Sequence, residues 1–227
     1  VTVAATQMAC SDNTRANIDK AKDLISKCAS EGAQIILIQE LFESVYFPCL
    51  NDPKNFELAK PFENNPLLNE MSDLAKELGV VLPMSFFEQD NNTYYNSLAM
   101  IDADGKILDI YRKSHIPDGP GYEEKYYFHP GNTGFKVFNT AFGKIGAGIC
   151  WDQWFPEAAR IMTLNGAELI FYPTAIGSEP DNSDLDSRDS WQIVMQGHSA
   201  ANCVPAISPT ILQPPFSERL MPLWTAA

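Results

Sequence analysis

GAGICWDQWFPE, residues 146–157, is an apolar, glycine-punctuated stretch that changes character at Cys150. Its first part is typical of a strand, and Pro156-Glu157 indicates a helix start. A thiol at a strand end, just before a helix, lies near unpaired backbone N–H groups and the positive end of the helix macrodipole, which favour a thiolate. The stretch therefore predicts an α/β fold with Cys150 as a candidate nucleophile. The alternative is a buried cysteine that serves only as a small apolar side chain.

Strand and helix patterns alternate on both sides of this stretch. The continuous apolar run at 33–38 is typical of a strand buried on both faces. Asp104-Gly105 predicts a tight hairpin turn between two strands, so an antiparallel pair joins the alternating pattern and the sheets are mixed. The predicted helices span 13–31, 67–78, 156–165 and 187–202, and the predicted strands span 1–8, 33–38, 80–87, 93–101, 106–112, 135–138, 144–150, 168–172 and 204–207.

The composition indicates one globular domain. The chain has 227 residues, 45% of them hydrophobic, and neither a membrane-spanning run nor a signal peptide is recognisable. Its five cysteines are irregularly spaced, which predicts reduced thiols and a cytoplasmic location. The net charge of −13 argues against nucleic acid or an anionic membrane as a partner and mildly favours a cationic ligand, although many proteins are acidic only for solubility.

Two further strand ends carry groups that could act with the thiol. Glu40 follows the buried strand at 33–38, and Lys113 follows the strand at 106–112. Ligand crevices form at the carboxyl ends of strands in α/β sheets, so we expect Glu40, Lys113 and Cys150 to lie together. Each residue alone would more often be a solvated or structural side chain, and it is the joint pattern that favours a site.

Three motifs resemble those of a known family. The strings IQELF at 38–42, YRKSHIP at 111–117 and GICWD at 148–152 look like the catalytic motifs of the nitrilase superfamily of carbon–nitrogen hydrolases. The longer strings at 117–122, 150–160 and 172–180 resemble the branch that hydrolyses N-carbamoylputrescine. The resemblance implies a nitrilase-type α/β fold, a four-layer α-β-β-α sandwich with mixed sheets.

The resemblance also implies roles for the site residues. Glu40 would be the general base, Cys150 the nucleophile, and Lys113 the donor that stabilises the oxyanion, together with the backbone N–H of Trp151. A second family glutamate corresponds to Glu124, with the neighbouring Glu123 as a rival.

The implied substrate is a small cationic carbamoyl-amine, cleaved to putrescine, ammonia and carbon dioxide without cofactor or metal. Its ammonium needs a carboxylate or an aromatic face, for which Glu179 and Asp118 are the candidates, with Tyr122 and Trp151 as walls. A homo-oligomer is also expected.

The resemblance ends near residue 206. We therefore expect a carbon–nitrogen hydrolase domain at 1–206 and a divergent tail at 207–227, whose prolines oppose a central strand. The sandwich would then be incomplete at the C-terminus, and Val1 suggests an incomplete start. Two alternatives remain open: another nitrilase-type amidase that acts on short acid amides, or a truncated, catalytically inactive remnant.

Overall fold

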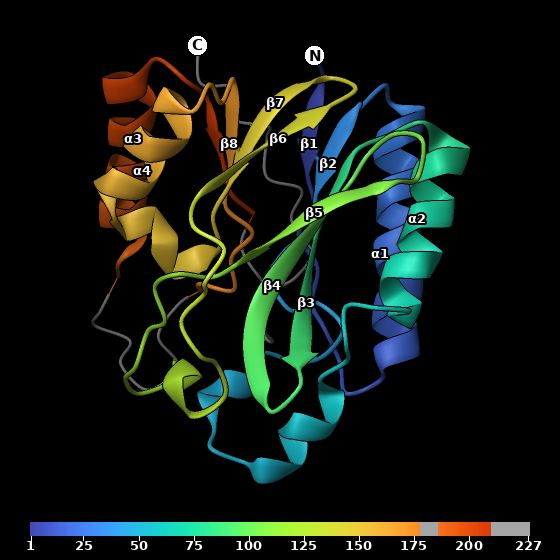
Figure 1. Ribbon diagram of the computed structural model, residues 1–227, viewed down its shortest axis with the longest axis vertical. Helices are drawn as coiled ribbons and strands as arrows, with labels where there is room; N and C mark the ends of the chain where they lie inside the picture. Colours follow the sequence, from blue (N-terminus) through green and yellow to red (C-terminus); the bar gives the residue numbers. More distant parts are fainter. Residues whose placement is uncertain (178–185, 210–227) are drawn as a thin grey trace.

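The computed structural model describes residues 1–177 and 186–209. In this part of the chain, two β-layers lie face to face between two pairs of helices (Figure 1). The strands are β1 (Val3–Ala5), β2 (Ile35–Leu37), β3 (Leu82–Asp90), β4 (Thr93–Ile101), β5 (Ile107–Arg112), β6 (Lys136–Thr140), β7 (Gly143–Ala147), β8 (Leu169–Phe171) and β9 (Ala206–Ile207). The helices are α1 (Thr14–Ser30), α2 (Pro66–Leu78), α3 (Pro156–Leu164) and α4 (Arg188–Asn202), with 3₁₀ helices η1 (Phe47–Cys49), η2 (Pro53–Leu58), η3 (Glu124–Tyr126) and η4 (Cys150–Trp154).

The first β-layer combines parallel and antiparallel pairs. β1 pairs with β2 in parallel, while β3, β4 and β5 form an antiparallel meander. A parallel bridge between Ile35 and Val81 joins the two groups, and Val81 N–H donates to the carbonyl of Gln34 at 2.9 Å. The turn between β4 and β5 places Gly105 at φ 84°, a left-handed conformation that glycine adopts readily, and the predicted hairpin is confirmed.

The second β-layer has the order β6-β7-β8-β9. β6 and β7 form an antiparallel hairpin, and β7, β8 and β9 are parallel neighbours. Parallel neighbours need a crossover connection, which α3 supplies between β7 and β8, and α4 supplies between β8 and β9. The mixed sheets predicted by the sequence are therefore present in both layers.

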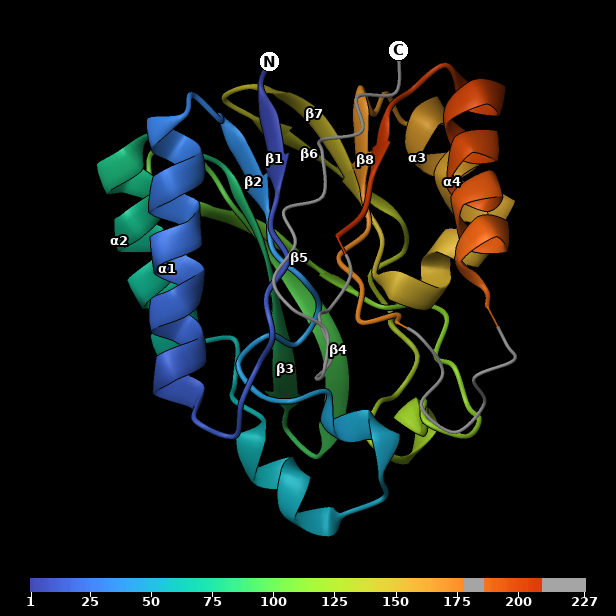
Figure 2. The ribbon, with the colours of Figure 1, turned by 180° about the vertical axis from the view of Figure 1, so that it is seen from behind.

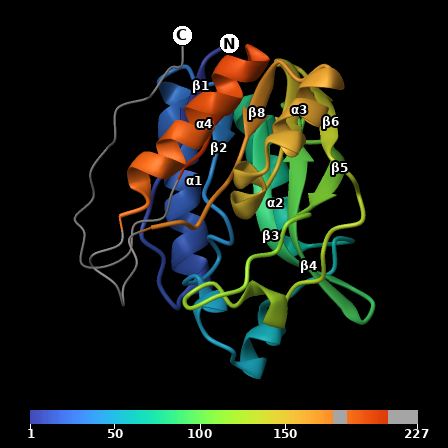
Figure 3. The same cartoon turned by 90° about the vertical axis from the view of Figure 1, so that its left-hand side faces the viewer.

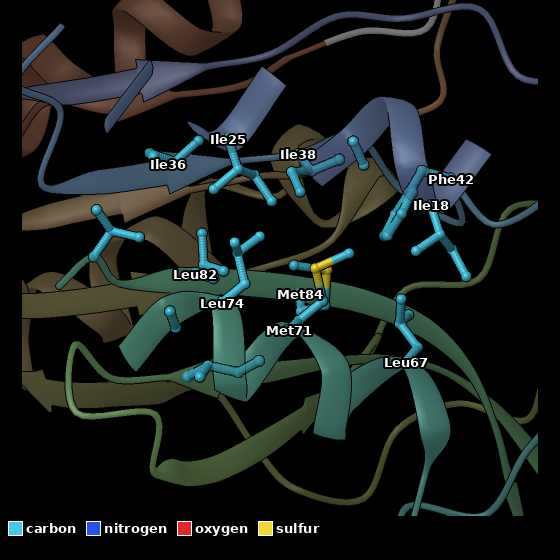
Figure 4. Packing of buried hydrophobic residues seen from close by; sticks show 14 of the residues in the cluster. Ile18, Ile25, Ile36, Ile38, Phe42, Leu67, Met71, Leu74, Leu82 and Met84 are labelled. Atoms are coloured by element: carbon cyan, nitrogen blue, oxygen red, sulfur yellow. The ribbon is translucent and has the colours of Figure 1, made fainter. Parts of the chain in front are cut away.

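The apolar alternation of the strands explains the layering. On β2, Ile36 packs with α1 and α2, while Ile35 and Leu37 pack against the second β-layer. Figure 4 shows Ile18 and Ile25 of α1 and Met71 and Leu74 of α2 packed with Ile36, Leu82 and Met84. Side chains of a strand point alternately to opposite faces, so a continuous apolar run fills two cores at once.

The helices on the opposite side cover the second layer. Ala158 and Met162 of α3 and Met195 of α4 pack against Ile170 of β8. The side view shows α3 and α4 beside β8 (Figure 3), and the view from behind brings α1 and α4 to the front (Figure 2). The layers thus run α-β-β-α (Figure 1), as the sequence leads us to expect.

Side chains at the helix ends set the limits of α1 and α2. The side-chain oxygen of Asn13 accepts from Ala16 N–H, and that of Asn65 accepts from the N–H groups of Leu67 and Leu68. These bonds satisfy donors that a helix start leaves unpaired. Gly79 ends α2 in a left-handed conformation, as its position after the last apolar residue predicts.

Most predicted elements are confirmed, but several boundaries are wrong: the strand predicted at 1–8, for example, covers only Val3–Ala5. β7 ends at Ala147, not at Cys150, and Cys150 begins η4. Of the expected tail at 207–227, only residues up to 209 lie within the described part. In the same part, no helix combines the length and the apolar character that a membrane span requires.

Candidate active site

The three candidate side chains from strand ends lie near one another in space. Lys113 follows β5 directly, and Glu40 and Cys150 lie shortly beyond β2 and β7. Cys150 has a φ of 42°, which is rare for a residue with a side chain. Its N–H donates to the carbonyl of Pro173 at 2.9 Å, so the segment after β8 holds this backbone in place.

Lys113 is the centre of a buried ion cluster. Its Nζ donates to Glu40 Oε1 at 2.9 Å and to both carboxylate oxygens of Glu124, at 2.8 and 2.7 Å. All three side chains have no solvent-accessible surface. Buried charges are stable only when they are paired and hydrogen-bonded, and here one ammonium serves two carboxylates.

Glu40 has further partners from distant parts of the chain. Asn96 Nδ2 donates to Oε1 at 2.6 Å, and the Ala175 N–H donates to Oε2 at 2.9 Å. Glu40 N–H in turn donates to the Thr174 carbonyl at 3.4 Å. Residues 173–175 therefore contact both Cys150 and Glu40, and this segment sets the position of the thiol relative to the carboxylate.

Glu124, rather than its rival Glu123, reaches the cluster. Glu124 begins η3 and is fully buried, and the Tyr46 hydroxyl donates to its Oε1 at 2.5 Å. Glu123 is only half-buried, and its N–H donates to the Pro48 carbonyl.

The electrostatics of the thiol differ from the sequence-based expectation. Burial raises the pKa of Cys150 well above its usual value, Glu40 and Glu124 raise it further, and Lys113 opposes the rise. Cys150 is the first residue of a five-residue 3₁₀ helix, and its buried position beside two carboxylates outweighs any helix-dipole effect. The expectation of a locally favoured thiolate is wrong, so the thiol needs a base to accept its proton.

The same surroundings favour the charged form of Lys113, whereas they favour the neutral form of Cys150. Burial acts to lower the pKa of Lys113, but Glu124 and Glu40 outweigh burial and hold that pKa above its usual value. Burial raises the pKa of Glu124 to about 7, against the effect of Lys113. Lys113 therefore stays charged, while the pKa of Glu124 lies near neutral pH.

Cys150 opens onto a cavity of about 210 Å³. Its lining residues are mostly apolar or aromatic: Pro117, Tyr122, Cys150, Trp151, Gln153, Trp154, Ile176 and Ser187. The ring of Tyr122 lies 6.0 Å from that of Tyr46, which connects this wall to the residue that holds Glu124. A small organic molecule with an apolar chain fits such a site.

Of the four residues predicted to bind the substrate, two line the cavity. Tyr122 and Trp151 line the cavity, as expected for its walls. Asp118 follows the lining residue Pro117, but its own side chain is exposed and does not line the cavity. Glu179 lies outside the described residues. A role for either carboxylate stays a prediction.

The carboxylate of Asp152 accepts hydrogen bonds from several parts of the site, a role that the sequence analysis does not predict. Its carboxylate accepts from the Tyr111 hydroxyl at 2.7 Å, from the Ile149 N–H at 2.9 Å and from the His115 N–H at 3.0 Å. His115 Nδ1 lies 2.7 Å from the same carboxylate. Asp152 thus ties the loop that carries Lys113 to the turn that carries Cys150. In the sequence, the one indication of this role is that Asp152 belongs to the motif at 148–152.

Comparison with known proteins identifies relatives over most of the chain. Residues 2–212 match the carbon-nitrogen hydrolase family. The chain is 61% identical over 208 residues to an N-carbamoylputrescine amidase of Solanum lycopersicum, covering 92% of this chain and 69% of that protein. It is 54% identical over 208 residues to a citrullinase of Francisella tularensis, covering 92% of this chain and 73% of that protein.

A solved structure agrees with the sequence match. The carbon-nitrogen hydrolase from Helicobacter pylori G27 has a TM-score of 0.87 at 37% identity, over 92% of this chain and 73% of that chain. The resemblance to the nitrilase superfamily inferred from the three motifs is confirmed. The chain belongs to the carbon-nitrogen hydrolase family.

Proposed function

We propose that the chain hydrolyses the ureido group of N-carbamoylputrescine and releases putrescine, ammonia and carbon dioxide, as a step of polyamine biosynthesis. The observation that carries the proposal is the buried cluster of Glu40, Lys113 and Glu124, whose charges act on the thiol of Cys150. The relatives named N-carbamoylputrescine amidase, at 58–61% identity, support the substrate.

Proton transfer from Cys150 to Glu40 generates the nucleophile in this proposal. The transfer converts a carboxylate and a thiol into a carboxylic acid and a thiolate, so the buried cluster keeps the same net charge. A charge brought in from solvent would meet the cost of burial, whereas this internal exchange avoids it. The thiolate then attacks the carbamoyl carbon.

Lys113 acts as the oxyanion donor once Glu40 is neutral. In the free protein its ammonium hydrogens point to Glu40 and Glu124. A protonated Glu40 binds the ammonium less strongly, which releases one N–H toward the oxygen of the tetrahedral intermediate. The backbone N–H of Trp151 supplies a second donor.

Breakdown of the intermediate completes the cycle. Glu40 returns its proton to the departing amine, and the carbamoyl group remains on the sulfur of Cys150. A water molecule, deprotonated by Glu40, then attacks the thiocarbamate and regenerates the thiol. The product carbamate decomposes to ammonia and carbon dioxide. Tyr122 and Trp151 flank the diamine chain, and Asp118 and Glu179 are the proposed partners of its ammonium.

Ammonia release from N-carbamoylputrescine by the purified chain tests the proposal. We expect steady turnover with the wild type and a rate at background with Cys150→Ala. A higher kcat/KM for a short neutral or anionic amide would instead favour the other nitrilase-type amidase. No turnover of any of these substrates by folded protein would favour the inactive remnant.

The acid limb of the pH profile is expected to report Glu124. Its carboxyl, with a pKa of about 7, is charged above that pH and neutral below it, and the neutral form no longer holds Lys113 as an ion pair. The kcat/KM should therefore fall about tenfold per pH unit below about pH 7. A pH–rate profile of wild type and Glu124→Gln checks this, because the residual activity of the variant should lack the limb.

Glu43 provides the matched control for that profile. Burial also raises its pKa to about 7, but it lines a separate cavity of about 130 Å³ with Leu41 and Lys60. Glu43→Gln should keep the acid limb. Loss of the limb in Glu43→Gln, or its persistence in Glu124→Gln, would contradict the assignment.

Asp152→Asn should disturb the relative position of Lys113 and Cys150. The amide replaces an acceptor oxygen by a donor and opposes two of the N–H or O–H groups that now bind Asp152. We expect kcat to fall about 10- to 100-fold with a much smaller change in KM. Asp109→Asn, at an exposed carboxylate of β5, is the control. Equal kcat values for the two variants would contradict the role.

Exposed apolar side chains support a homo-oligomer, and free cysteines support a cytoplasmic location. Leu164 of α3 and Ile193 of α4 are 77% and 66% exposed, and apolar side chains on neighbouring helices favour contact with a second copy. All five cysteines lie in the described part and are free thiols, as in a reducing compartment. Size-exclusion chromatography with light scattering tests the assembly.

A further inference from the structure

The hydroxyl of Tyr46 makes a short contact with the buried ion cluster. It donates to Oε1 of Glu124 at 2.5 Å, and the side chains of both residues are buried. Tyr46 lies just before η1, whereas Glu124 begins η3, so the bond joins two loops that are 78 residues apart in the chain. An O–H to carboxylate distance of about 2.5–2.7 Å is typical of a strong, charge-assisted hydrogen bond. Tyr46 therefore favours the ionised form of Glu124.

The charges around Tyr46 keep its own proton in place. Burial raises the pKa of Tyr46 well above its usual value. The carboxylates of Glu124 and Glu40 raise this pKa further, and so does a negative charge on Cys150. The hydroxyl therefore remains neutral, and toward Glu124 it acts only as a donor.

The carboxyl of Glu124 is surrounded by groups with opposite effects on its pKa. Burial and the charge of Glu40 favour the neutral form, whereas the ammonium of Lys113 and the hydroxyl of Tyr46 favour the ionised form. Lys113 follows β5 and Glu40 lies shortly beyond β2, while on η3 itself Lys125 is exposed to solvent. The balance leaves the pKa of Glu124 at about 7, so the loss of one donor changes its ionisation in the neutral range.

The ionised form of Glu124 fixes the position of Lys113. Both carboxylate oxygens accept from the Lys113 ammonium, at 2.8 and 2.7 Å, and the same ammonium donates to Glu40 at 2.9 Å. A protonated Glu124 carries a hydrogen on one of its oxygens and accepts less well from Lys113. The ammonium would then bind Glu40 more strongly, which makes Glu40 a weaker base for the thiol.

The ring of Tyr46 is held by packing that does not need the hydroxyl. It belongs to an apolar cluster that includes Phe47, Ile116 and Tyr127. Its centroid lies 6.0 Å from that of Tyr122, which lines the cavity beside the thiol. A phenylalanine ring fills the same space, so Tyr46→Phe removes the oxygen and little else.

We propose that Tyr46 is a positioning residue of the reaction, whose hydroxyl keeps Glu124 ionised and thereby holds Lys113 between Glu124 and Glu40. This inference rests on the proposed function, because its effect is measured through hydrolysis of N-carbamoylputrescine. In this role Tyr46 acts through Glu124. Its loss therefore changes the pH range of activity more than the maximal rate.

The experiment compares the pH profiles of kcat/KM for wild type and Tyr46→Phe. Loss of a donor to the ionised form raises the pKa of Glu124, so the variant needs a higher pH to reach the same ionised fraction. We expect the acid limb to move up by about one pH unit, which lowers kcat/KM about tenfold at about pH 6. The plateau above the limb should change by less than about threefold. Circular dichroism at each pH gives the folded fraction, for which the rates are corrected.

Two further variants at the same contact sharpen the test. Fluorine makes a phenol more acidic and a stronger donor, so Tyr46→3-fluorotyrosine should move the limb to lower pH. Glu124→Gln has no carboxyl to titrate at this position. Adding Tyr46→Phe to Glu124→Gln should therefore produce no further change in the shape of the profile.

Tyr127→Phe is the matched control. Tyr127 packs in the same apolar cluster as Tyr46, but its hydroxyl donates to the Leu50 carbonyl at 2.5 Å and not to a carboxylate. The variant removes the same oxygen from the same kind of ring. It should keep the acid limb at the wild-type pH, whatever its effect on stability.

The outcomes separate this inference from the proposed function. A limb that stays at the wild-type pH in Tyr46→Phe or with 3-fluorotyrosine overturns the inference and leaves the proposed function standing. An equal loss of activity at every pH in Tyr46→Phe, or an equal shift in Tyr127→Phe, does the same. Absence of turnover by folded wild type overturns the proposed function itself, and this inference with it.

Discussion

Cys150→Ala is expected to lower kcat for ammonia release from N-carbamoylputrescine by at least about 10⁴-fold. Among the described residues that line the cavity, Cys150 carries the one thiol, and it lies beside the buried carboxylates. Without it the acyl-transfer route is lost, and oriented water is a poor substitute. Folding should be retained, because the change removes one sulfur from a site that already adjoins a cavity. Coupled ammonia detection and a thermal melt measure the two quantities.

Matched cysteine variants control for general thiol effects. Cys49 and Cys203 are free and exposed, so Cys49→Ala and Cys203→Ala should leave kcat within about twofold of wild type. Cys150→Ser tests the nucleophile itself, since a hydroxyl keeps the geometry but has a much higher pKa. A kcat of Cys150→Ala above about one tenth of the wild-type value would contradict the assignment of Cys150 as the nucleophile.

Lys113→Met is expected to lower kcat about 10³-fold and to reduce the free energy of unfolding by about 3–5 kcal/mol. Methionine keeps the length and the apolar stem of lysine but removes the ammonium. Glu40 and Glu124 then remain buried without their cation, and the oxyanion loses its donor. Steady-state kinetics and chemical denaturation measure the two effects.

A double variant separates stability from catalysis. Lys113→Met with Glu124→Gln removes one of the unpaired carboxylates, so it should recover part of the lost stability while kcat stays low. Lys136→Met, at a partly exposed ion pair with Asp109, is the control and should change stability by less than about 1 kcal/mol. Recovery of kcat in the double variant would contradict a direct role of Lys113 at the oxyanion.

The layers of the fold follow from apolar patterns that the sequence shows directly. The run at 33–38 predicts a strand buried on both faces, and β2 indeed packs against α1 and α2 on one face and the second β-layer on the other. The hairpin at Asp104-Gly105 depends only on local turn chemistry. The end of β7 was harder to predict, because Gly148 and Ile149 continue the apolar pattern after the ladder has ended at Ala147.

The site was predictable as a set of strand ends, but its internal contacts were not. Glu40 and Lys113 could be placed together because buried charges need partners. The Tyr46 bond to Glu124 and the Asn96 bond to Glu40 join residues far apart in sequence, and no local pattern indicates them. Similarly, the choice between Glu123 and Glu124 depends on the orientation of η3.

The chemical state of the thiol was predicted incorrectly for a physical reason. The sequence shows the helix start after Cys150 but not the burial of the sulfur or the carboxylates that act on it. Both effects favour the neutral thiol, and they make Glu40 necessary as the proton acceptor. Cys150 is therefore a neutral thiol at rest, and its activation takes place within a buried cluster whose net charge stays constant.

The most direct test is acid-quench mass spectrometry of the protein during its first turnover of N-carbamoylputrescine. We expect one carbamoyl group attached to Cys150, with putrescine released before ammonia, and no adduct in Cys150→Ala. A carbamoyl group on another residue, or turnover that proceeds in Cys150→Ala, would contradict catalysis by the Cys150 thiol.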